Sequence, residues 1–419
     1  EAEGYVSLGI SVDIAKCAAR NAKKVIAELN PNMPLTYGDT FIPIDQIDYF
    51  VLVDSPLIEY EHPVVESAIV EQIARYIAGI IDDGSTLQIG LGRIPTHMLK
   101  FLENRRDVGI HSDVITDAVI DLIEKGILTG RRKSMHQGQI ITSYCMGTRR
   151  LYDMVNRNPL FAFYPLEYVC NPFNISRNNK MVSVSQAFAV DLTGQICADQ
   201  FAGEFYGGVS TQPDFLRGAA ASPGGKPIIC LPSTTDDGKY SHIRPLLLSG
   251  EGVTISRSDV HYVITEFGIA YLFGKSIRER ALALIEIAHP DFRSWLLEEA
   301  KKLEYVRADQ SLKSKVAYPI AEEREVIMKN GAKILIRPSK ASDVEMLQNL
   351  FYHMSQHDIY TRFFQRMKSL PVAQAQHFCN VDFEREMAFI AVTGVRENEQ
   401  IVGSSMYVMD HATNLAEVA

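Results

Sequence analysis

A long helical stripe of apolar residues marks the first strongly patterned part of the sequence. Between positions 64 and 81 the apolar residues recur three and four positions apart, at Val64, Val65, Ala68, Ile69, Ile73, Ala74, Ile77, Ala78 and Ile81. The run Asp82-Asp83-Gly84-Ser85 then supplies a helix stop, and a short apolar strand follows at 86–89. This spacing predicts an amphipathic helix followed by a buried strand, which is the beginning of an α/β unit.

Strand patterns rich in Val and Ile recur through the middle of the chain. They lie at 180–184, 227–231, 253–255 and 260–265, with helical patterns between them and a last helix at 278–287. This alternation predicts an open α/β fold with a mostly parallel or mixed sheet covered by helices. The first sixty residues have a β-α-β rhythm too, and because they begin in mid-pattern we expect that an N-terminal portion is missing.

The pattern changes after about residue 305. Residues 306–332 lose periodicity and carry the charged run Glu322-Glu323-Arg324-Glu325, so a linker is predicted there. A strand at 333–338, an amphipathic helix at 343–354 and strands at 387–392 and 400–408 follow, the last two joined by a polar turn at 397–399. The predicted domains are therefore 1–62, 63–305 and an α+β unit at 333–419.

Composition and charge narrow the class of protein. The 419 residues are 46% hydrophobic with a net charge of −9, which favours two or three domains and argues against a general nucleic-acid binder. The longest apolar runs are interrupted well short of a membrane span, and the first residues do not form a signal peptide, so we expect a soluble, cytoplasmic protein. The six cysteines lack a C-x-x-C pair and are interpreted as reduced core thiols, and the histidines lack metal-ligand spacing.

Two glycines, Gly90 and Gly92, lie directly after the strand at 86–89 and before a helix. Backbone amides at such a turn can meet an anionic or carbonyl group of a ligand. A tight turn that needs glycine for steric reasons is an equally good interpretation of this pair alone.

The glycine pair is one of a series of motifs with the order and spacing of a known family. They are Gly109-Ile110-His111-Ser112-Asp113, Glu167-Tyr168-Val169-Cys170-Asn171-Pro172, Asp191-Leu192-Thr193-Gly194-Gln195, Gln212-Pro213-Asp214-Phe215, Gly224-Gly225-Lys226-Pro227, Thr265-Glu266-Phe267-Gly268, Ser276-Ile277-Arg278-Glu279-Arg280-Ala281 and Ala288-His289-Pro290-Asp291-Phe292-Arg293. From about Gly4 to Lys301 the chain closely resembles the acetyl-CoA hydrolase/transferase family, the class I CoA-transferases of the 4-hydroxybutyrate kind. The resemblance implies CoA-transferase-type α/β domains, with acyl-CoA and a carboxylate as substrates and no metal.

The resemblance also implies a mechanism and its residues. In the family a glutamate carboxylate attacks the acyl-CoA carbonyl, and a glycine amide and an asparagine side chain stabilise the tetrahedral intermediates. Matched to this sequence, the nucleophile falls at Asp113, the asparagine at Asn171, the family's Gly-Gly pair at Ser210-Thr211 and a supporting glutamate at Glu266. The residues expected to contact coenzyme A are Gly90, Gly92, Gly208, Gly225 and Lys226.

Two of the four catalytic positions depart from the family pattern. Asp113 is one methylene shorter than glutamate, so its oxygen would lie about 1 Å or more from the expected point of attack, a displacement that can cost on the order of a hundredfold in rate. Thr211 adds a branched side chain, and if the family backbone there has positive φ, its amide would be re-aimed. Two functions therefore stay open: an enzyme that transfers coenzyme A or hydrolyses acyl-CoA, and a degenerate acyl-CoA-binding module that regulates an attached domain.

Several residues also have a purely structural interpretation. Asp113 is a favoured residue for a helix N-cap before Val114, and this alternative weighs about as much as a nucleophile. Asn171 before Pro172 is typical of a turn. The run Arg131-Arg132-Lys133 is predicted to be a solvated loop, with a smaller chance that it meets the phosphates of coenzyme A.

The C-terminal part has a resemblance of its own. Its motifs are Ile336-Arg337-Pro338, Asp343, Tyr360-Thr361-Arg362-Phe363-Phe364, Glu386-Met387-Ala388-Phe389-Ile390-Ala391-Val392 and Ile401-Val402-Gly403-Ser404. Residues 333–419 resemble the beginning of a GNAT acetyltransferase domain, but they stop before the glycine-rich turn and helix that would hold the pyrophosphate of acetyl-CoA. The tail is thus expected to be a partial GNAT-like unit, and a protein is a possible substrate of this unit. We also expect that the chain forms a homo-oligomer.

Overall fold

The computed structural model describes most of the chain, and contact patterns divide it into two compact units. The described residues are 4–61, 67–201, 203–312, 318–363, 366–379, 381, 383, 386–394, 399–410 and 415–418. The first unit holds residues 1–187 and 198–230, and the second holds 188–197 and 231–419. This division differs from the linear boundaries expected from the sequence, because the short segment 188–197 belongs with residues that come much later in the chain.

Four parallel strands form the centre of the first unit. They are β7 (Gly109–Ile110), β6 (Thr86–Ile89), β12 (Met181–Gln186) and β17 (Lys226–Cys230), in that spatial order. Nearly all of their residues are buried, as strands covered by helices on both faces require. The strands predicted around 86–89, 180–184 and 227–231 are confirmed.

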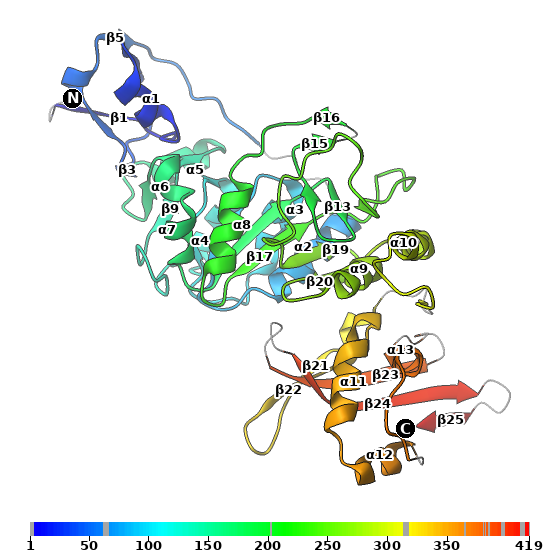
Figure 1. Cartoon of the computed structure of the whole chain (residues 1–419). Coiled ribbons are helices and arrows are strands. Elements are labelled where there is room, and N and C mark those ends of the chain that lie inside the picture. The colour runs from blue at the N-terminus through cyan, green and yellow to red at the C-terminus, as the bar shows by residue number, and fades with distance from the viewer. Residues whose placement is uncertain are drawn as a thin grey trace. The chain divides into compact units, whose positions relative to one another are not determined.

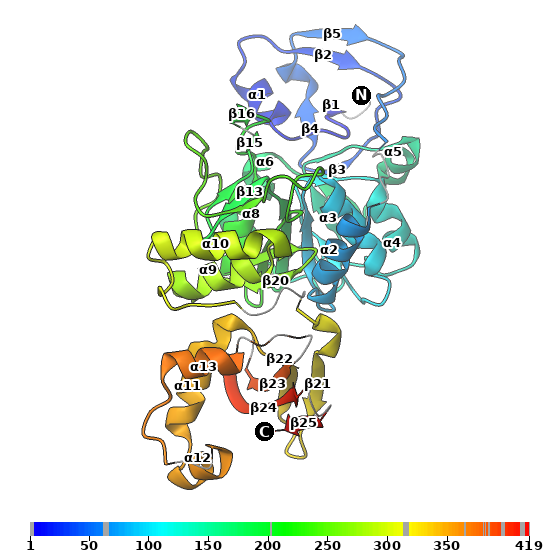
Figure 2. The same ribbon diagram turned by 90° about the vertical axis from the view of Figure 1, so that its right-hand side faces the viewer.

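Helices cover these strands. Helix α8 (Gln212–Ala221) packs against β12 and β17, α3 (Arg93–Met98) packs against β12, and α2 (Ala68–Gly79) packs against α3. Figures 1 and 2 show α2 and α3 side by side. The predicted helix at 64–81 is confirmed as α2, which begins with a Ser67 cap and buries its apolar stripe. The start of that pattern, at 64–66, lies outside the described residues.

The first unit also holds smaller strand pairings, most of them parallel. Strands β3 (Tyr37–Gly38), β11 (Phe161–Phe163) and β9 (Ile140–Thr142) form one parallel group, and β8 (Val114–Ile115) pairs with β10 (Tyr144–Cys145). At the N-terminal end, β1 (Tyr5–Ser7) pairs with β4 (Phe41–Pro43), and β2 (Ile26–Leu29) lies parallel to β5 (Tyr49–Leu52). Helix α1 (Ala15–Asn21) lies between β1 and β2 in the chain, which gives the predicted β-α-β rhythm.

The second unit begins with short strands and two helices. Strand β13 (Ala189–Asp191) pairs with β14 (Ile196–Cys197) and β18 (Ile243–Arg244), while β19 (Tyr262–Thr265) and β20 (Gly268–Tyr271) form a hairpin. Helix α9 (Ile277–Glu286) confirms the helix predicted at 278–287, and α10 (Pro290–Lys302) follows it. The strand predicted at 253–255 is wrong in extent, because only a single bridge joins Ile255 to Ile196.

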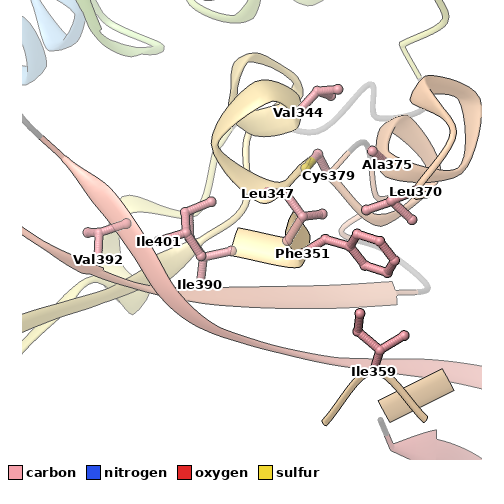
Figure 3. Close-up of a cluster of buried hydrophobic side chains, with 10 residues drawn as sticks. All are labelled: Val344, Leu347, Phe351, Ile359, Leu370, Ala375, Cys379, Ile390, Val392 and Ile401. Atoms are coloured by element: carbon pink, nitrogen blue, oxygen red, sulfur yellow. The ribbon is translucent and has the colours of Figure 1, made fainter. Parts of the chain in front are cut away.

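The tail of the second unit is an antiparallel sheet with helices packed on it. Its strands run in the order β21 (Arg324–Ile327), β22 (Lys333–Pro338), β23 (Glu386–Thr393), β24 (Gln400–Asp410) and β25 (Leu415–Val418). Helices α11 (Val344–His353), α12 (Gln356–Phe363) and α13 (Val372–Cys379) supply side chains to a core that Figure 3 shows around Phe351. Strand β21 lies inside the predicted linker, and the polar turn expected at 397–399 lies, except for Glu399, outside the described residues, as does Phe364.

Five of the six cysteines are buried, in agreement with core thiols, and Cys17 is exposed. Within the part of the chain that the structure describes, no helix combines the length and apolarity that a membrane span needs.

Candidate active site

Asp113 lies in a short connection between two strands at the carboxyl end of β7. Its backbone carbonyl accepts hydrogen bonds from the amides of Ser143 (3.0 Å) and Tyr144 (3.1 Å), which joins it to the region of β10. The residues after it, Val114 and Ile115, form strand β8. The alternative that Asp113 caps a helix is therefore wrong, because no helix begins at Val114 and the chain continues as a strand.

The Asp113 side chain is enclosed and held by hydroxyl groups. Only 8% of the residue is exposed. Thr211 Oγ1 donates a hydrogen bond of 2.7 Å to Oδ2, while Ser112 Oγ donates a long one of 3.4 Å to Oδ1. Burial raises the pKa of the Asp113 carboxyl above its ordinary value, although the hydrogen bonds from Thr211, the Val114 amide and Ser112 oppose the rise. A carboxylate with a raised pKa is a stronger base and nucleophile than an exposed one.

Thr211 occupies the N-cap position of α8. Its backbone is in the ordinary right-handed region (φ −90°, ψ −2°), and its hydroxyl does not cap the helix because it binds Asp113 instead. The residue before it, Ser210, has a positive φ of 61°. In this chain the left-handed conformation, which non-glycine residues adopt with some strain, therefore belongs to Ser210 and not to Thr211.

Asn171 caps helix α7 (Pro172–Ser176), its Oδ1 accepting the Phe173 amide at 2.9 Å. The local role of Asn171 is therefore that of a helix N-cap, where the sequence indicated a turn. The cap uses only the carbonyl oxygen, so the amide nitrogen keeps its donors for another group. The preceding residue is Cys170. Its burial is the main cause that raises the pKa of its thiol, and the charge of the nearby Asp113 carboxylate is the second cause.

The glycines after β6 lie against the backbone and side chains of β12. The Gly90 amide donates to the Val184 carbonyl at 2.9 Å, and a Cβ on Gly90 would lie 2.8 Å from that oxygen. A Cβ on Gly92, the N-cap of α3, would lie 3.0 Å from Gln186 Oε1. Both positions are at the carboxyl end of parallel strands, the edge at which α/β sheets bind their ligands.

Three other residues predicted to bind coenzyme A have different surroundings. Gly208 is exposed, and a Cβ there would meet no other described atom within 4 Å. A Cβ on Gly225 would lie 1.9 Å from the Ala219 carbonyl oxygen, so this glycine permits close packing of α8 against the start of β17. The Lys226 ammonium binds Asp82 Oδ2 (2.5 Å) and the Ile80 carbonyl (2.8 Å) at the amino end of β17. The structure does not bring Gly225 and Lys226 together with Asp113, and their predicted role remains untested.

Glu266 belongs to the second unit, where it follows β19. Its two carboxylate oxygens accept from Ser233, one from the hydroxyl at 2.6 Å and one from the amide at 2.9 Å. This double contact fixes the carboxylate at the end of the strand, where the sequence placed it.

Lys133 is buried, which the sequence did not indicate. It is 1% exposed, and its ammonium donates to the carbonyls of Ile110 and Gln139, each at 2.8 Å. Burial lowers its pKa to about 7. The prediction of a solvated loop is therefore wrong for Lys133. Its aliphatic chain lies over Gly109, where a Cβ would be 2.4 Å from Lys133 Cγ, a tertiary contact that no local pattern in the sequence indicates.

His111, which the sequence presents only as part of the motif at 109–113, is also enclosed. It is 1% exposed, and its Nε2 lies 2.8 Å from the Val169 carbonyl oxygen. Among the described residues no group of three or more His, Cys, Asp or Glu side chains is arranged to hold a metal ion.

Comparison with known proteins gives a consistent picture. Residues 1–61 match the model of the acetyl-CoA hydrolase/transferase N-terminal domain, and residues 147–300 match that of the C-terminal domain. The chain is 48% identical over 302 residues to the 4-hydroxybutyrate coenzyme A transferase of Clostridium kluyveri, covering 71% of this chain and 70% of that protein. It is 40% identical over 300 residues to the succinyl-CoA:cyclohexane-1-carboxylate CoA transferase of Geobacter metallireducens, covering 72% and 68%.

Solved structures agree with these relatives. The crystal structure of RipA from Yersinia pestis is 38% identical with a TM-score of 0.69, over 73% of this chain and 69% of that one. A 4-hydroxybutyrate CoA-transferase from Porphyromonas gingivalis is 40% identical with a TM-score of 0.65, over 72% of each chain.

Proposed function

This chain belongs to the acetyl-CoA hydrolase/transferase family, and we propose that it transfers coenzyme A from an acyl-CoA to a carboxylate, or hydrolyses the acyl-CoA, through the Asp113 carboxylate. The observation that carries this proposal is the state of Asp113. It is an enclosed carboxylate with a raised pKa, located at the carboxyl end of a parallel strand and hydrogen-bonded to the N-cap residue of a helix.

The reaction would proceed by covalent catalysis. An Asp113 oxygen attacks the thioester carbonyl, the C–S bond breaks, and a mixed anhydride and the CoA thiolate form. The thiolate then attacks the aspartyl carbonyl, which releases the first carboxylate and leaves an aspartyl-CoA thioester. A second carboxylate reverses these steps to give a new acyl-CoA, whereas water gives hydrolysis.

The two oxygens of Asp113 would have different tasks. Among the hydroxyl contacts, Oδ2 accepts the short hydrogen bond from Thr211 and Oδ1 accepts the long one from Ser112, while the Val114 amide also donates to the carboxylate. Since a hydrogen bond to an oxygen stabilises its charge and weakens it as a nucleophile, Oδ1, which has the weaker hydroxyl contact, is the proposed site of attack. The amide nitrogen of Asn171 and the backbone amide of Thr211 are the proposed donors to the tetrahedral intermediates.

Mass spectrometry of a trapped intermediate tests the proposal. We expect that incubation with acetyl-CoA followed by proteolysis yields a CoA or acyl adduct on the peptide that carries Asp113. Asp113→Asn keeps the shape of the side chain but lacks the nucleophilic charge, so it should show neither adduct nor turnover. Turnover that persists in Asp113→Asn would rule out Asp113 as the nucleophile.

A second candidate function follows from the pair Asp113 and Thr211. Because the Thr211 hydroxyl ties up one carboxylate oxygen, the chain could bind acyl-CoA without converting it and act as a regulatory module for its tail. Calorimetric titration with acetyl-CoA separates the two candidates: binding with no adduct and no turnover favours the module, and absence of binding contradicts both.

For the tail we propose a partial GNAT-like unit that binds a protein substrate. The support is the strand order of its antiparallel sheet, with helices α11 to α13 between β22 and β23. Binding of a lysine peptide by the chain, lost when residues after 332 are deleted, would support this, whereas peptide binding that is unchanged by the deletion would contradict it. A cytoplasmic location and a homo-oligomer are part of the same proposal, and fractionation and light scattering test them.

A further inference from the structure

His111 contacts three segments that each carry a candidate group of the active site. Its backbone lies two residues before Asp113, in the same connection after β7. Its ring nitrogen Nε2 is bonded to the carbonyl of Val169, which lies two residues before Asn171. Its ring makes a T-shaped contact with the ring of Phe215 in α8, the helix that begins after Thr211, with centroids 6.3 Å apart.

The bond to Val169 fixes the form of the imidazole. A carbonyl oxygen can only accept, so Nε2 must carry the hydrogen. Burial, with the nearby Lys133 ammonium as the second cause, lowers the pKa of His111 to about 3, and the ring is therefore neutral at physiological pH. The other nitrogen, Nδ1, is buried and has no hydrogen-bond partner among the described residues.

The backbone around His111 is held as firmly as its ring. The His111 amide donates to Leu87 of β6 at 3.0 Å, and the Ser112 amide donates to Ile141 of β9 at 3.0 Å. From the other side the Lys133 ammonium donates to Ile110, the residue before His111. The ring is therefore attached to a rigid backbone. We expect that loss of the hydrogen bond at Nε2 would change the distances between the three segments and would leave the backbone around His111 in place.

We infer that His111 is a positioning residue which, through its bond to the Val169 carbonyl and its contact with Phe215, sets the position of the Asp113 carboxylate relative to Asn171 and the start of α8. The inference rests on the proposed function, since it concerns the geometry of that reaction. A misplacement of about 1 Å between reacting groups can cost about a hundredfold in rate. His111 touches no reacting atom and acts only through these segments.

Two substitutions separate positioning from simple support. His111→Phe keeps a ring against Phe215 but cannot donate to Val169, whereas His111→Gln keeps a donor of similar reach. We expect His111→Phe to lower kcat about thirtyfold to a hundredfold per folded molecule, with KM for acetyl-CoA changed less than about threefold. His111→Gln should recover at least about tenfold of that loss. The control is His136→Gln, which removes an imidazole that is only partly buried and is bonded to Tyr168 at 2.6 Å.

Nitrogen NMR of the wild-type protein adds a readout that a folding defect in the variants would not affect. We expect His111 to be neutral with the hydrogen on Nε2 from pH 5 to pH 8, and a hydrogen on Nδ1 would overturn the inference. Equal kcat per folded molecule in wild type and His111→Phe, with an Asp113 adduct formed in both, would overturn it while leaving the proposed function intact. A wild type without adduct or turnover would instead overturn the proposed function.

Discussion

At the scale of single residues, Asp113 and Thr211 form a matched pair. Thr211 Oγ1 lies 2.7 Å from Asp113 Oδ2, so a carboxylate longer by one methylene would need the space that the threonine side chain holds. We therefore expect Asp113→Glu alone to change kcat/KM by less than about fivefold. The double variant with Thr211→Gly frees that space and should raise kcat/KM on the order of a hundredfold.

Steady-state kinetics of the four proteins in this cycle gives the coupling directly. Thr211→Gly alone serves as the control. Because it removes the hydroxyl that donates to the buried Asp113 carboxylate, we expect it to lower the free energy of unfolding by about 1–3 kcal/mol, so the rates are compared per folded molecule. Single-variant effects that simply multiply to the effect of the double variant would mean that the two side chains do not compete for space.

Lys133 gives a prediction for pH. The pKa of its ammonium is lowered in the folded protein to about 7, against about 10.5 for an exposed lysine. Above pH 7 the unfolded chain binds this proton and the folded protein does not, so the free energy of unfolding should rise with pH. We expect a contribution of about 2 kcal/mol between pH 7 and pH 9, measured by urea unfolding. Lys133→Met fills the same path over Gly109 and should lack this contribution; an unchanged pH dependence would contradict it.

At the scale of elements, the junction of α8 and β17 depends on Gly225. A Cβ there would lie 1.9 Å from the Ala219 carbonyl oxygen, so Gly225→Ala forces the helix away from the strand. We expect a loss of about 2–3 kcal/mol in the free energy of unfolding. Gly224→Ala is the matched control: its φ is +69° but its Cβ would meet Lys180 at 3.5 Å, an ordinary contact, so the loss should be about 1 kcal/mol.

The same pair of variants tests the predicted contact of Gly225 with coenzyme A. If the glycine is needed only for packing, Gly225→Ala that has folded should bind acetyl-CoA as the wild type does. Weaker binding of acetyl-CoA with an unchanged free energy of unfolding would support a contact between Gly225 and coenzyme A.

Element-scale prediction worked where periodicity was long and failed where it was short. The stripe of α2 and the apolar run of β12 have enough residues to define a period, and both were found from the sequence. Strand β8 has two residues, Val114 and Ile115, which fit a strand or a helix start equally well, so Asp113 could not be told from a helix cap. The burial of Lys133 and the bond from His111 to Val169 depend on tertiary packing, which no local pattern contains.

At the scale of the whole molecule, linear boundaries could not describe the units. Residues 188–197 pair with a strand at 243–244 and with residue 255, so they join the second unit although the residues around them belong to the first. The family resemblance predicted Asp113, Asn171 and Thr211 as site residues, because sequence motifs can be matched without knowledge of the packing. It could not indicate the contacts between α9 and the tail, because the tail lies beyond the part of the chain that resembles this family.

A last prediction concerns Glu286, the final residue of α9, which contacts the tail just before α11. Its Oε1 accepts the Ser342 amide at 3.3 Å, just before α11 begins. Burial raises the pKa of Glu286 to about 7, with Asp343 also raising it and Lys340 and the backbone amides opposing the rise. The contact is thus most stable with a protonated Glu286, fully so below about pH 4.5, and it weakens as pH rises through 7.

Glu286→Gln should remove this pH dependence, because the amide keeps an acceptor oxygen and carries no charge. We expect the unfolding midpoint of the tail to fall in the wild type between pH 5 and pH 8, by an amount equivalent to at most about 3 kcal/mol, and to stay nearly constant in Glu286→Gln. Glu345→Gln is the control, since it breaks the exposed ion pair with Arg278 (3.0 Å) on the same surface, worth less than about 1 kcal/mol. If Glu286→Gln follows the wild type across this range, the burial of Glu286 does not govern how the tail is held, and the charges of Lys340 and Asp343 would have to do so.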